Sequence, residues 1–158
     1  EAITQLSNVL RNSLLMGKQK LIPLGDEMKL VNDYLGLEKT RFEERLTIVM
    51  KIEKNAQVFL LPPLMIQTLV ENGIKHGTSK LPKGGVLEVN AFIHNEQLEV
   101  VIYNSGFYDK THQPETGFGV ANTIQRLKLL YGSKARFQIE NENNRVKTSL
   151  VIPKQTIL

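Results

Sequence analysis

The chain of 158 residues contains no cysteine and no tryptophan, and aromatic residues make up only 6% of it. Without cysteine it can form neither a disulfide framework nor a thiolate site. No apolar run approaches the roughly 20 residues of a membrane-spanning helix, and the first residues lack a signal-peptide pattern. With 41% hydrophobic and 23% charged residues, the composition is that of an ordinary globular protein. The length predicts one domain with room for an additional helical piece.

The basic residues are dispersed along the sequence. The formal net charge is +4, but lysines stand among acids, as in Lys51, Glu53 and Lys54, rather than in clusters with aromatic residues. Nucleic-acid interfaces usually gather basic residues on one face, so we expect no nucleic-acid partner. Because the chain starts at Glu1 rather than at a methionine, we expect it to be part of a longer protein.

Two helices are predicted in the first part of the chain. Apolar residues recur at helical spacing in residues 3–15, and Gly17 and Pro23 end that segment. A second helix is predicted from Asp26, a suitable N-cap, to about Glu44.

Short alternating runs replace the helical spacing after residue 45 and predict antiparallel strands and hairpins. Helical spacing returns in two places between these runs. The order of elements predicts an α+β fold, in which one sheet is covered by helices on one face. The predicted strands are residues 46–52, 86–93, 98–104, 135–141 and 145–153, with a hairpin turn at "HNEQ" (94–97), and the later helices lie within residues 61–77 and 119–132.

The stretch "LPPLMIQTLVENGIKHG" (61–77) carries both an apolar and a polar stripe. Ile66, Leu69, Val70 and Gly73 recur at i, i+3, i+4 and i+7, so this face should pack on the sheet. The spacing places five polar residues on the opposite side, which is either a solvated surface or a binding stripe: Thr68, Glu71, Asn72, Lys75 and His76.

Two glycine-containing segments follow this helix. "VIYNSG" (101–106) ends a predicted strand, and in "GFGVANTIQRL" (117–127) Gly117 and Gly119 open a predicted helix. Glycines at a helix N-terminus permit close approach of a phosphate, which the free N–H groups and the helix dipole favour. A G-x-G taken alone is weak evidence.

The ordered set "LVENGIKHG", "VIYNSG" and "GFGVANTIQRLKLLYG" resembles the N, G1 and G2 boxes of the GHKL ATP-binding fold of sensor histidine kinases, gyrase-type topoisomerases, Hsp90 and MutL. "LSNVLRNSLL" and "DEMKLVNDYLGLEKTRFEERL" are similar to the segment between the phosphoacceptor helix and the catalytic domain of LytS-like sensor histidine kinases. The resemblance implies a GHKL (Bergerat) two-layer α/β sandwich. Its mixed, mostly antiparallel sheet would be covered by helices on one face and preceded by N-terminal helices. It also implies a helical remnant of the dimerisation region in residues 1–44 and a catalytic ATP-binding domain in residues 45–158.

The resemblance implies a role for individual residues. Asn72 matches the asparagine that coordinates Mg²⁺, and Asn104 replaces the aspartate that accepts a hydrogen bond from the adenine amino group. Glu71 could polarise the incoming imidazole, and residues 107–116 would form a mobile lid. The implied catalytic residues are Glu71, Asn72 and Lys75, and the implied ATP-binding residues are Asn72, Lys75, His76, Asn104, Gly106, Gly117, Phe118, Gly119 and Val120.

Several departures from the family pattern refine these expectations. The amide of Asn104 can turn and offer its N–H to guanine O6, so discrimination between ATP and GTP should relax. Thr68 stands where hydrolytic members carry a water-activating glutamate, and a hydroxyl is a poor base, which favours a kinase. Thr148 matches the threonine of the family's final Gly-Thr pair, but Lys147 replaces the glycine. Asn122 and Arg126 have no assigned role, and His94 and His112 are expected to be solvated.

We therefore expect the catalytic part of a two-component sensor histidine kinase. It would bind Mg²⁺ and ATP and transfer the γ-phosphoryl group to a histidine upstream of this chain, which lacks the family's His-Phe-x-Phe-Asn type motif. The alternatives are a non-catalytic nucleotide-binding regulator and a GHKL-type ATPase module. The resemblance further implies a response regulator receiver domain as partner and a homodimer in the full-length protein. The catalytic region would be cytoplasmic, with the protein anchored in the bacterial inner membrane.

Overall fold

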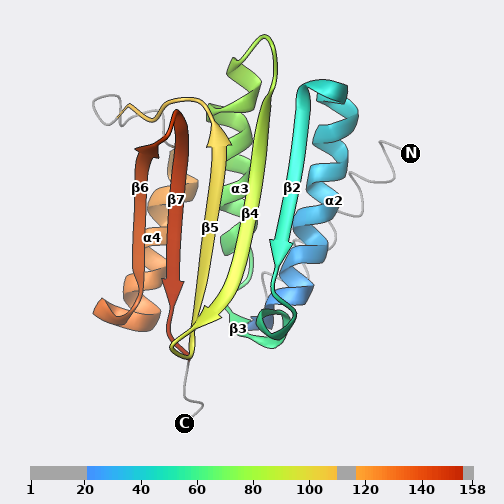
Figure 1. The fold of residues 1–158 in the computed structure, drawn as a ribbon. Coiled ribbons are helices and arrows are strands. Elements are labelled where there is room, and N and C mark those ends of the chain that lie inside the picture. Colours follow the sequence, from blue (N-terminus) through green and yellow to red (C-terminus); the bar gives the residue numbers. More distant parts are fainter. Residues whose placement is uncertain (1–20, 110–116, 155–158) are drawn as a thin grey trace.

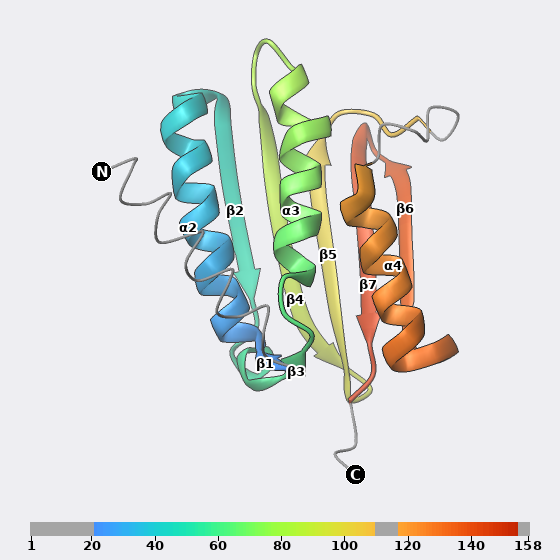
Figure 2. The ribbon, with the colours of Figure 1, turned by 180° about the vertical axis from the view of Figure 1, so that it is seen from behind.

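The computed structural model describes residues 21–109 and 117–154, in which three α-helices cover one face of a five-stranded sheet (Figures 1 and 2). The helices are α2 (Leu24–Phe42), α3 (Met65–His76) and α4 (Gly117–Tyr131). The strands of the sheet are β2 (Leu46–Ile52), β4 (Gly85–His94), β5 (Gln97–Ser105), β6 (Arg136–Glu142) and β7 (Arg145–Ile152). A two-stranded sheet of β1 (Ile22–Pro23) and β3 (Leu60–Leu61) and short 3-10 helices, η1 (Glu43–Arg45), η2 (Lys54–Val58), η3 (Thr78–Lys80) and η5 (Gly132–Lys134), complete the described part.

The strand order is β2-β4-β5-β7-β6, and the sheet is mixed. The predicted hairpins β4–β5 and β6–β7 are confirmed, and β5 pairs antiparallel with β7. The mixed, mostly antiparallel sheet that the resemblance implied is confirmed. The alternating runs alone predicted antiparallel strands, whereas β2 pairs parallel with β4, with Leu46 opposite Gly85. A parallel pair needs a crossover connection, and α3 provides it between β2 and β4.

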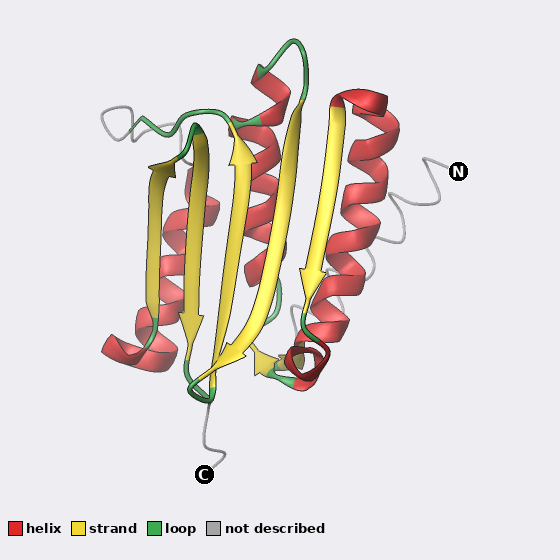
Figure 3. Cartoon of the chain, viewed as in Figure 1, coloured by secondary structure: helices red, strands yellow, loops and turns green. Residues whose placement is uncertain are grey.

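Side chains alternate between the two faces of the sheet. On β5, Leu98, Val100, Ile102 and Asn104 are buried, while the residues between them are only partly buried. This period of two is that of a sheet with one covered face. Figures 2 and 3 show α3 in the middle of the helical layer, between α2 and α4. We call the face beneath these helices the covered face and the other the open face.

The helix predicted from Asp26 to about Glu44 is confirmed as α2, which begins two residues earlier, after Pro23. Its buried side chains, including Met28 and Val31, pack in the same core cluster as those of α3 and β5. The core therefore runs across residue 44, and the expected domain boundary there stays a prediction. The helix predicted for residues 3–15 and most of the predicted lid lie outside the described residues. Among the helices that the structure describes, none is long and apolar enough to cross a membrane.

Candidate functional site

Helix α3 presents its polar residues to two neighbours. Its apolar face is buried as predicted. Thr68 faces α4, because a Cβ atom added to Gly119 would lie 2.9 Å from Thr68 Cγ2. Glu71 and Lys75 instead line a cavity of about 530 Å³ between α2 and α3. The stripe is therefore not one solvated surface, since its residues belong to two flanks of the helix.

Asn104 ends the covered face of β5 and is buried, with 4% of its surface exposed. Its Nδ2 donates a hydrogen bond of 3.1 Å to the Ser105 carbonyl oxygen. Its Oδ1 faces α3, and a Cβ atom at Gly73 would lie only 3.2 Å from it. The contact fixes both the position and the orientation of this amide against the middle of α3.

Gly77 and Gly106 allow β5 and the end of α3 to approach each other. A Cβ atom at Gly77 would lie 2.5 Å from the Gly73 carbonyl oxygen and would also collide with Asn104. Gly106 has φ +129°, which side-chain-bearing residues rarely adopt, and a Cβ there would lie 3.4 Å from Gly77 Cα. The sequence drew attention to Gly106 but gave no role to Gly77, although Gly77 is the last residue of the first of the three boxes.

Helix α4 begins at Gly117, as the two glycines predicted. Gly119 is exposed beside Thr68, whereas Val120 is buried, with 6% exposed. The side chain of Phe118 lies outside the described residues. The structure thus brings together Asn104, the middle of α3 and the start of α4, which come from three separate segments of the sequence.

Glu71 and Lys75 lie on the flank of α3 that faces α2, away from Gly119. Glu71 is half-buried, and its Oε1 accepts a hydrogen bond of 2.8 Å from Gln67 Nε2. Across the cavity, burial and, to a lesser degree, the charge of Glu71 raise the pKa of Glu38. Burial and the charges of Glu38 and Glu71 likewise raise the pKa of Tyr34. Arg41, which also lines this cavity, acts in the opposite direction on both pKa values, so this flank is a partly desolvated groove with charges of both signs.

The other predicted positions are dispersed. His76 ends α3 and is half-buried, and Asn122 is exposed on α4. His94 ends β4 with Nδ1 3.7 Å from a carboxylate oxygen of Glu99, and His112 lies outside the described residues. Thr148 is buried on the covered face of β7.

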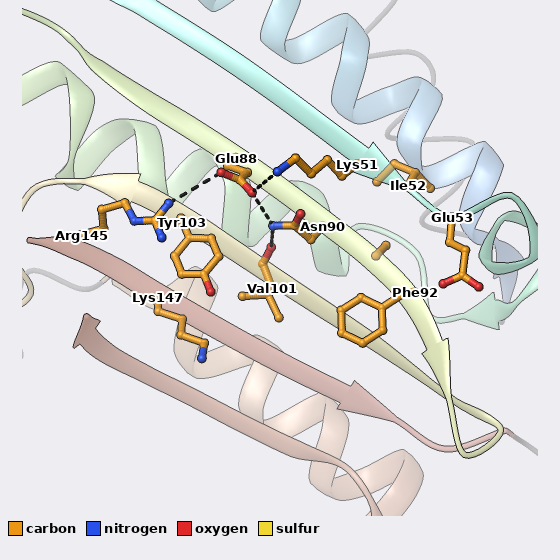
Figure 4. Close-up of a pocket in the computed structure, with 11 residues that line it drawn as sticks. Lys51, Ile52, Glu53, Glu88, Asn90, Phe92, Val101, Tyr103, Arg145 and Lys147 are labelled. Atoms are coloured by element: carbon orange, nitrogen blue, oxygen red, sulfur yellow. Dashed lines mark hydrogen bonds and ion pairs between the residues drawn. The ribbon is translucent and has the colours of Figure 1, made fainter. Parts of the chain in front are cut away.

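A larger cavity, of about 950 Å³, lies on the open face and contains none of the implied site residues (Figure 4). One of its lining residues, Glu88, accepts a hydrogen bond of 3.1 Å from Asn90 Nδ2. Glu88 also forms ion pairs of 3.2 Å with Lys51 and 3.6 Å with Arg145, whose guanidinium lies 3.9 Å from the centre of the Tyr103 ring. The charged side chains of this lining pair with one another at partly exposed positions, so the cavity has the character of a solvated sheet surface.

Two contacts at the start of α3 were missed by sequence reasoning. Glu27 of α2 accepts hydrogen bonds from backbone N–H groups there, and Arg126 of α4 donates to the Pro63 carbonyl oxygen at 2.9 Å. One signal was available. The sequence before α3 is Leu-Pro-Pro-Leu, which supplies no Ser, Thr, Asp or Asn as an N-cap.

The fold is that of histidine kinase catalytic domains. The chain superposes on the histidine kinase domain of the blue-light activated histidine kinase of Erythrobacter litoralis EL346 with a TM-score of 0.67 and 14% identity, covering 98% of this chain and 75% of that one. For the catalytic domain of histidine kinase ThkA the TM-score is 0.65 at 15% identity, covering 85% and 95%. ThkA in complex with the response regulator protein TrrA gives a TM-score of 0.61 at 14% identity, covering 97% and 48%.

Sequence comparison identifies the relatives within this class. The model of the histidine kinase family His_kinase matches residues 1–46. Sensor protein LytS of Staphylococcus haemolyticus is 36% identical over 98% of this chain, and sensor histidine kinase/phosphatase LytS of Staphylococcus aureus is 31% identical over 97% of it. The chain spans 29% and 28% of these relatives' own lengths. It is a homologue of the LytS-like sensor histidine kinases.

Proposed function

We propose that this chain is the catalytic part of a two-component sensor histidine kinase, which binds Mg²⁺ and ATP between α3 and α4 and transfers the γ-phosphoryl group to a histidine elsewhere. The observation that carries the proposal is the convergence of three segments on the middle turns of α3. Asn104 packs against Gly73, Gly119 packs against Thr68, and Asn72 lies between these contacts in the sequence of α3. The homology to LytS-like sensor kinases supports it.

The residues at this place fit a purine nucleotide. Asn104 is a buried amide whose Nδ2 already donates to the Ser105 carbonyl oxygen. If the amide turned so that Nδ2 faced guanine O6, the bond to Ser105 would be lost, and Oδ1 would face the Ser105 carbonyl oxygen instead. We therefore propose that ATP is preferred over GTP, in place of the relaxed discrimination expected from the sequence. The start of α4, with Gly117 and Gly119, would offer N–H groups to the phosphates.

The residues also fit a Mg²⁺ ion that arrives with the nucleotide. Asn72 is half-buried and offers one neutral amide oxygen. Among the described residues no group of three or more His, Cys, Asp or Glu side chains could hold a metal alone. A Mg²⁺ ion typically takes one or two protein ligands and completes its shell with phosphate oxygens and water. Asn72 would hold such an ion, which would neutralise charge on the transferring phosphoryl group.

Two side chains favour transfer to histidine over hydrolysis. The hydroxyl of Thr68 donates a hydrogen bond of 2.6 Å to the Leu64 carbonyl oxygen, so it cannot activate water as a carboxylate would. Glu71 is oriented by Gln67 on the flank that faces α2. It would hold and polarise an imidazole that approaches from that side, while Lys75 contributes positive charge nearby.

The proposal extends to partners and location. A receiver domain is the proposed phosphoryl acceptor after histidine, by analogy with ThkA, which was solved with a response regulator. We also propose a homodimer for the full-length protein, a cytoplasmic catalytic region and an anchor in the inner membrane. The segment matched by the kinase family ends at residue 46, which supports a division from the catalytic domain near residue 44.

Calorimetric titration of the chain with ATP, with and without EDTA, tests binding. Asn72→Ala should weaken binding in Mg²⁺ roughly tenfold or more, as loss of a group that holds a metal does. The exposed Asn55→Ala, on η2 and outside the three segments that form the site, is the matched control and should bind as the wild type does. Equal affinities for Asn72→Ala and the wild type would contradict the proposed Mg²⁺ ligand, and a GTP competition in the same cell would test base preference.

Transfer of labelled γ-phosphate to a separate LytS polypeptide that bears its phosphoacceptor histidine tests the reaction. The chain alone should bind ATP without labelling itself, and the mixture should yield an acid-labile, alkali-stable phosphoprotein. Glu71→Ala should reduce labelling and leave ATP affinity nearly unchanged. ATP binding without transfer would favour a nucleotide-binding regulator, and rapid hydrolysis without acceptor would favour an ATPase module.

A further inference from the structure

A completely buried carboxylate joins α2 to the start of α3. Glu27 has no exposed surface, although it belongs to a residue type that is seldom fully buried. Its Oε1 accepts a hydrogen bond of 2.8 Å from the Leu64 N–H. Its Oε2 accepts bonds of 2.9 Å from Ile66 N–H and 3.2 Å from Gln67 N–H. One side chain of α2 therefore binds most of the first turn of α3.

This first turn needs an acceptor from outside its own helix. The residue that precedes α3, Leu64, has φ +66° and provides no side-chain cap. The first N–H groups of any helix lack intrahelical partners, and the helix dipole favours negative charge beside them. Glu27 supplies both the acceptors and the charge. Its role goes beyond capping, because it lies on another helix and so fixes the position of α3 relative to α2.

The third helix reaches the same turn. Arg126 of α4 donates from Nη2 to the Pro63 carbonyl oxygen, at 2.9 Å. Burial raises the pKa of Glu27, while the three N–H groups and the positive charge of Arg126 act in the opposite direction. The turn Pro63–Gln67 is thus bound by Glu27 from α2 and by Arg126 from α4.

We infer that Glu27 is a positioning residue of the nucleotide site: through the turn Pro63–Gln67 it sets where α3 presents Asn72 to α4 and to Asn104. The inference rests on the proposed function for the identity of the ligand. Helix α2 begins within the segment matched by the kinase family, so a displacement of α2 would move α3 with it. Charge-assisted bonds from three N–H groups within residues 64–67 couple the two helices more strongly than apolar packing alone. Through this turn, a movement of the N-terminal segment would alter the position of α3 and hence the affinity for the nucleotide.

The test compares Glu27→Gln with Asp26→Asn in the 158-residue chain. Both variants remove one negative charge from the first turn of α2, but Asp26 is half-exposed and pairs only loosely with Lys29, at 4.0 Å. An amide at position 27 would turn an N–H toward the N–H groups of α3. Amide hydrogen exchange, followed residue by residue, reports whether α3 stays fixed. Calorimetry with ATP and Mg²⁺, at a temperature where both variants are folded, reports the nucleotide site.

For Glu27→Gln we expect exchange of the Leu64, Ile66 and Gln67 amides to be roughly ten- to hundredfold faster, as loss of charged hydrogen bonds implies. ATP affinity should fall roughly three- to thirtyfold, the range typical of coupling residues outside a ligand site. Asp26→Asn should change neither. A merely structural role would lower the melting temperature of Glu27→Gln but leave the ATP affinity of the folded protein unchanged, and that result would overturn the inference.

Arg126→Gln provides a second route if Glu27→Gln does not fold. It removes the bond to Pro63 from a half-buried position and leaves the Glu27 carboxylate in place. This variant should speed hydrogen exchange of the same three amides and weaken the binding of ATP several-fold. Unchanged exchange and affinity would overturn the role of the turn. If the wild-type chain binds no ATP, the proposed function fails, while the exchange data still decide whether Glu27 fixes α3.

Discussion

The two faces of the sheet satisfy their polar groups in opposite ways. In the layer between the helices and the covered face, two buried polar side chains bond to backbone: Glu27 of α2 at the start of α3, and Asn104 of β5 at Ser105. On the open face, charged side chains such as Glu88 and Lys51 pair with one another in contact with solvent. Groups held by backbone keep one geometry, as a binding site needs, whereas exposed pairs can rearrange. The larger open-face cavity is therefore the weaker site candidate.

The largest expected difference between the faces lies in neighbouring residues of β5. Ile102 points to the covered face with 1% of its surface exposed, and Val101 is partly buried on the open face. Ile102→Ala should lower the free energy of unfolding by about 3 kcal/mol, because it leaves a cavity among packed side chains. Val101→Ala, the matched control, should cost about 1 kcal/mol. Urea unfolding checks both, and equal losses would contradict the assignment of a single core on the covered face.

Gly77→Ala should have the next largest effect. The added Cβ would meet the Gly73 and Ser105 carbonyl oxygens at 2.5 and 2.7 Å, and backbone atoms cannot rotate away. Overpacking of this kind lowers the free energy of unfolding by about 2–3 kcal/mol. It should also displace Asn104 and weaken the binding of ATP. At Gly25 in α2 the nearest atom to a Cβ is the Gln57 carbonyl oxygen at 3.4 Å, so Gly25→Ala should be neutral or stabilise by up to about 1 kcal/mol. Thermal unfolding with an ATP titration compares the two.

Periodicity and turn chemistry predicted most of the fold. Alternation along β4 and β5 and the polar residues between the two strands made the hairpin readable from the sequence. In the structure the central turn residues, Asn95 and Glu96, both have positive φ, as tight hairpin turns require. The parallel direction of β2 was not readable, because strand direction depends on the path of the chain through α3 rather than on the local pattern.

The site was predicted in part. Motif spacing led to α3, Asn104 and the start of α4. It did not separate Glu71 from Thr68 on the two flanks of α3, because the rotation of a helix relative to its neighbours is set by packing. Glu27 was missed because its partners are backbone N–H groups 37 to 40 residues away, which no side-chain pattern reveals.

Asn104→Asp tests whether the covered face requires a neutral amide. The variant loses the donor to the Ser105 carbonyl oxygen and sets a buried carboxylate beside it. We expect unfolding free energy to fall by about 1–2 kcal/mol near neutral pH, as for a buried polar group without its partner. The loss should shrink at about pH 4, where the carboxyl group can be protonated. The exposed Asn55→Asp should change stability little at either pH, and a similar result for Asn104→Asp would mean that its surroundings tolerate charge.

Glu88→Gln should have the smallest effect, although Glu88 bonds to three side chains. The ion pairs with Lys51 and Arg145 are partly exposed, and such pairs contribute below about 1 kcal/mol, less in 1 M salt. The hydrogen bond from Asn90, the largest cause, and the two cations hold the pKa of Glu88 below its usual value. Its contribution is therefore fully present above about pH 4.5 and is lost as the pH falls through the lower folded-state pKa.

Glu27 should respond to pH with the opposite sign, and this difference extends the comparison of the two faces to single carboxylates. Because burial raises the pKa of Glu27, the folded state binds its proton more tightly than the unfolded state does. Its ionisation then lowers stability as the pH rises from about 4.5 through the raised value. NMR titration of the two carboxyl groups in the wild-type chain measures both pKa values directly, and Arg145→Gln should move only that of Glu88 upward. A Glu27 pKa below that of Glu88 would show that the three N–H bonds and Arg126 outweigh burial at the start of α3.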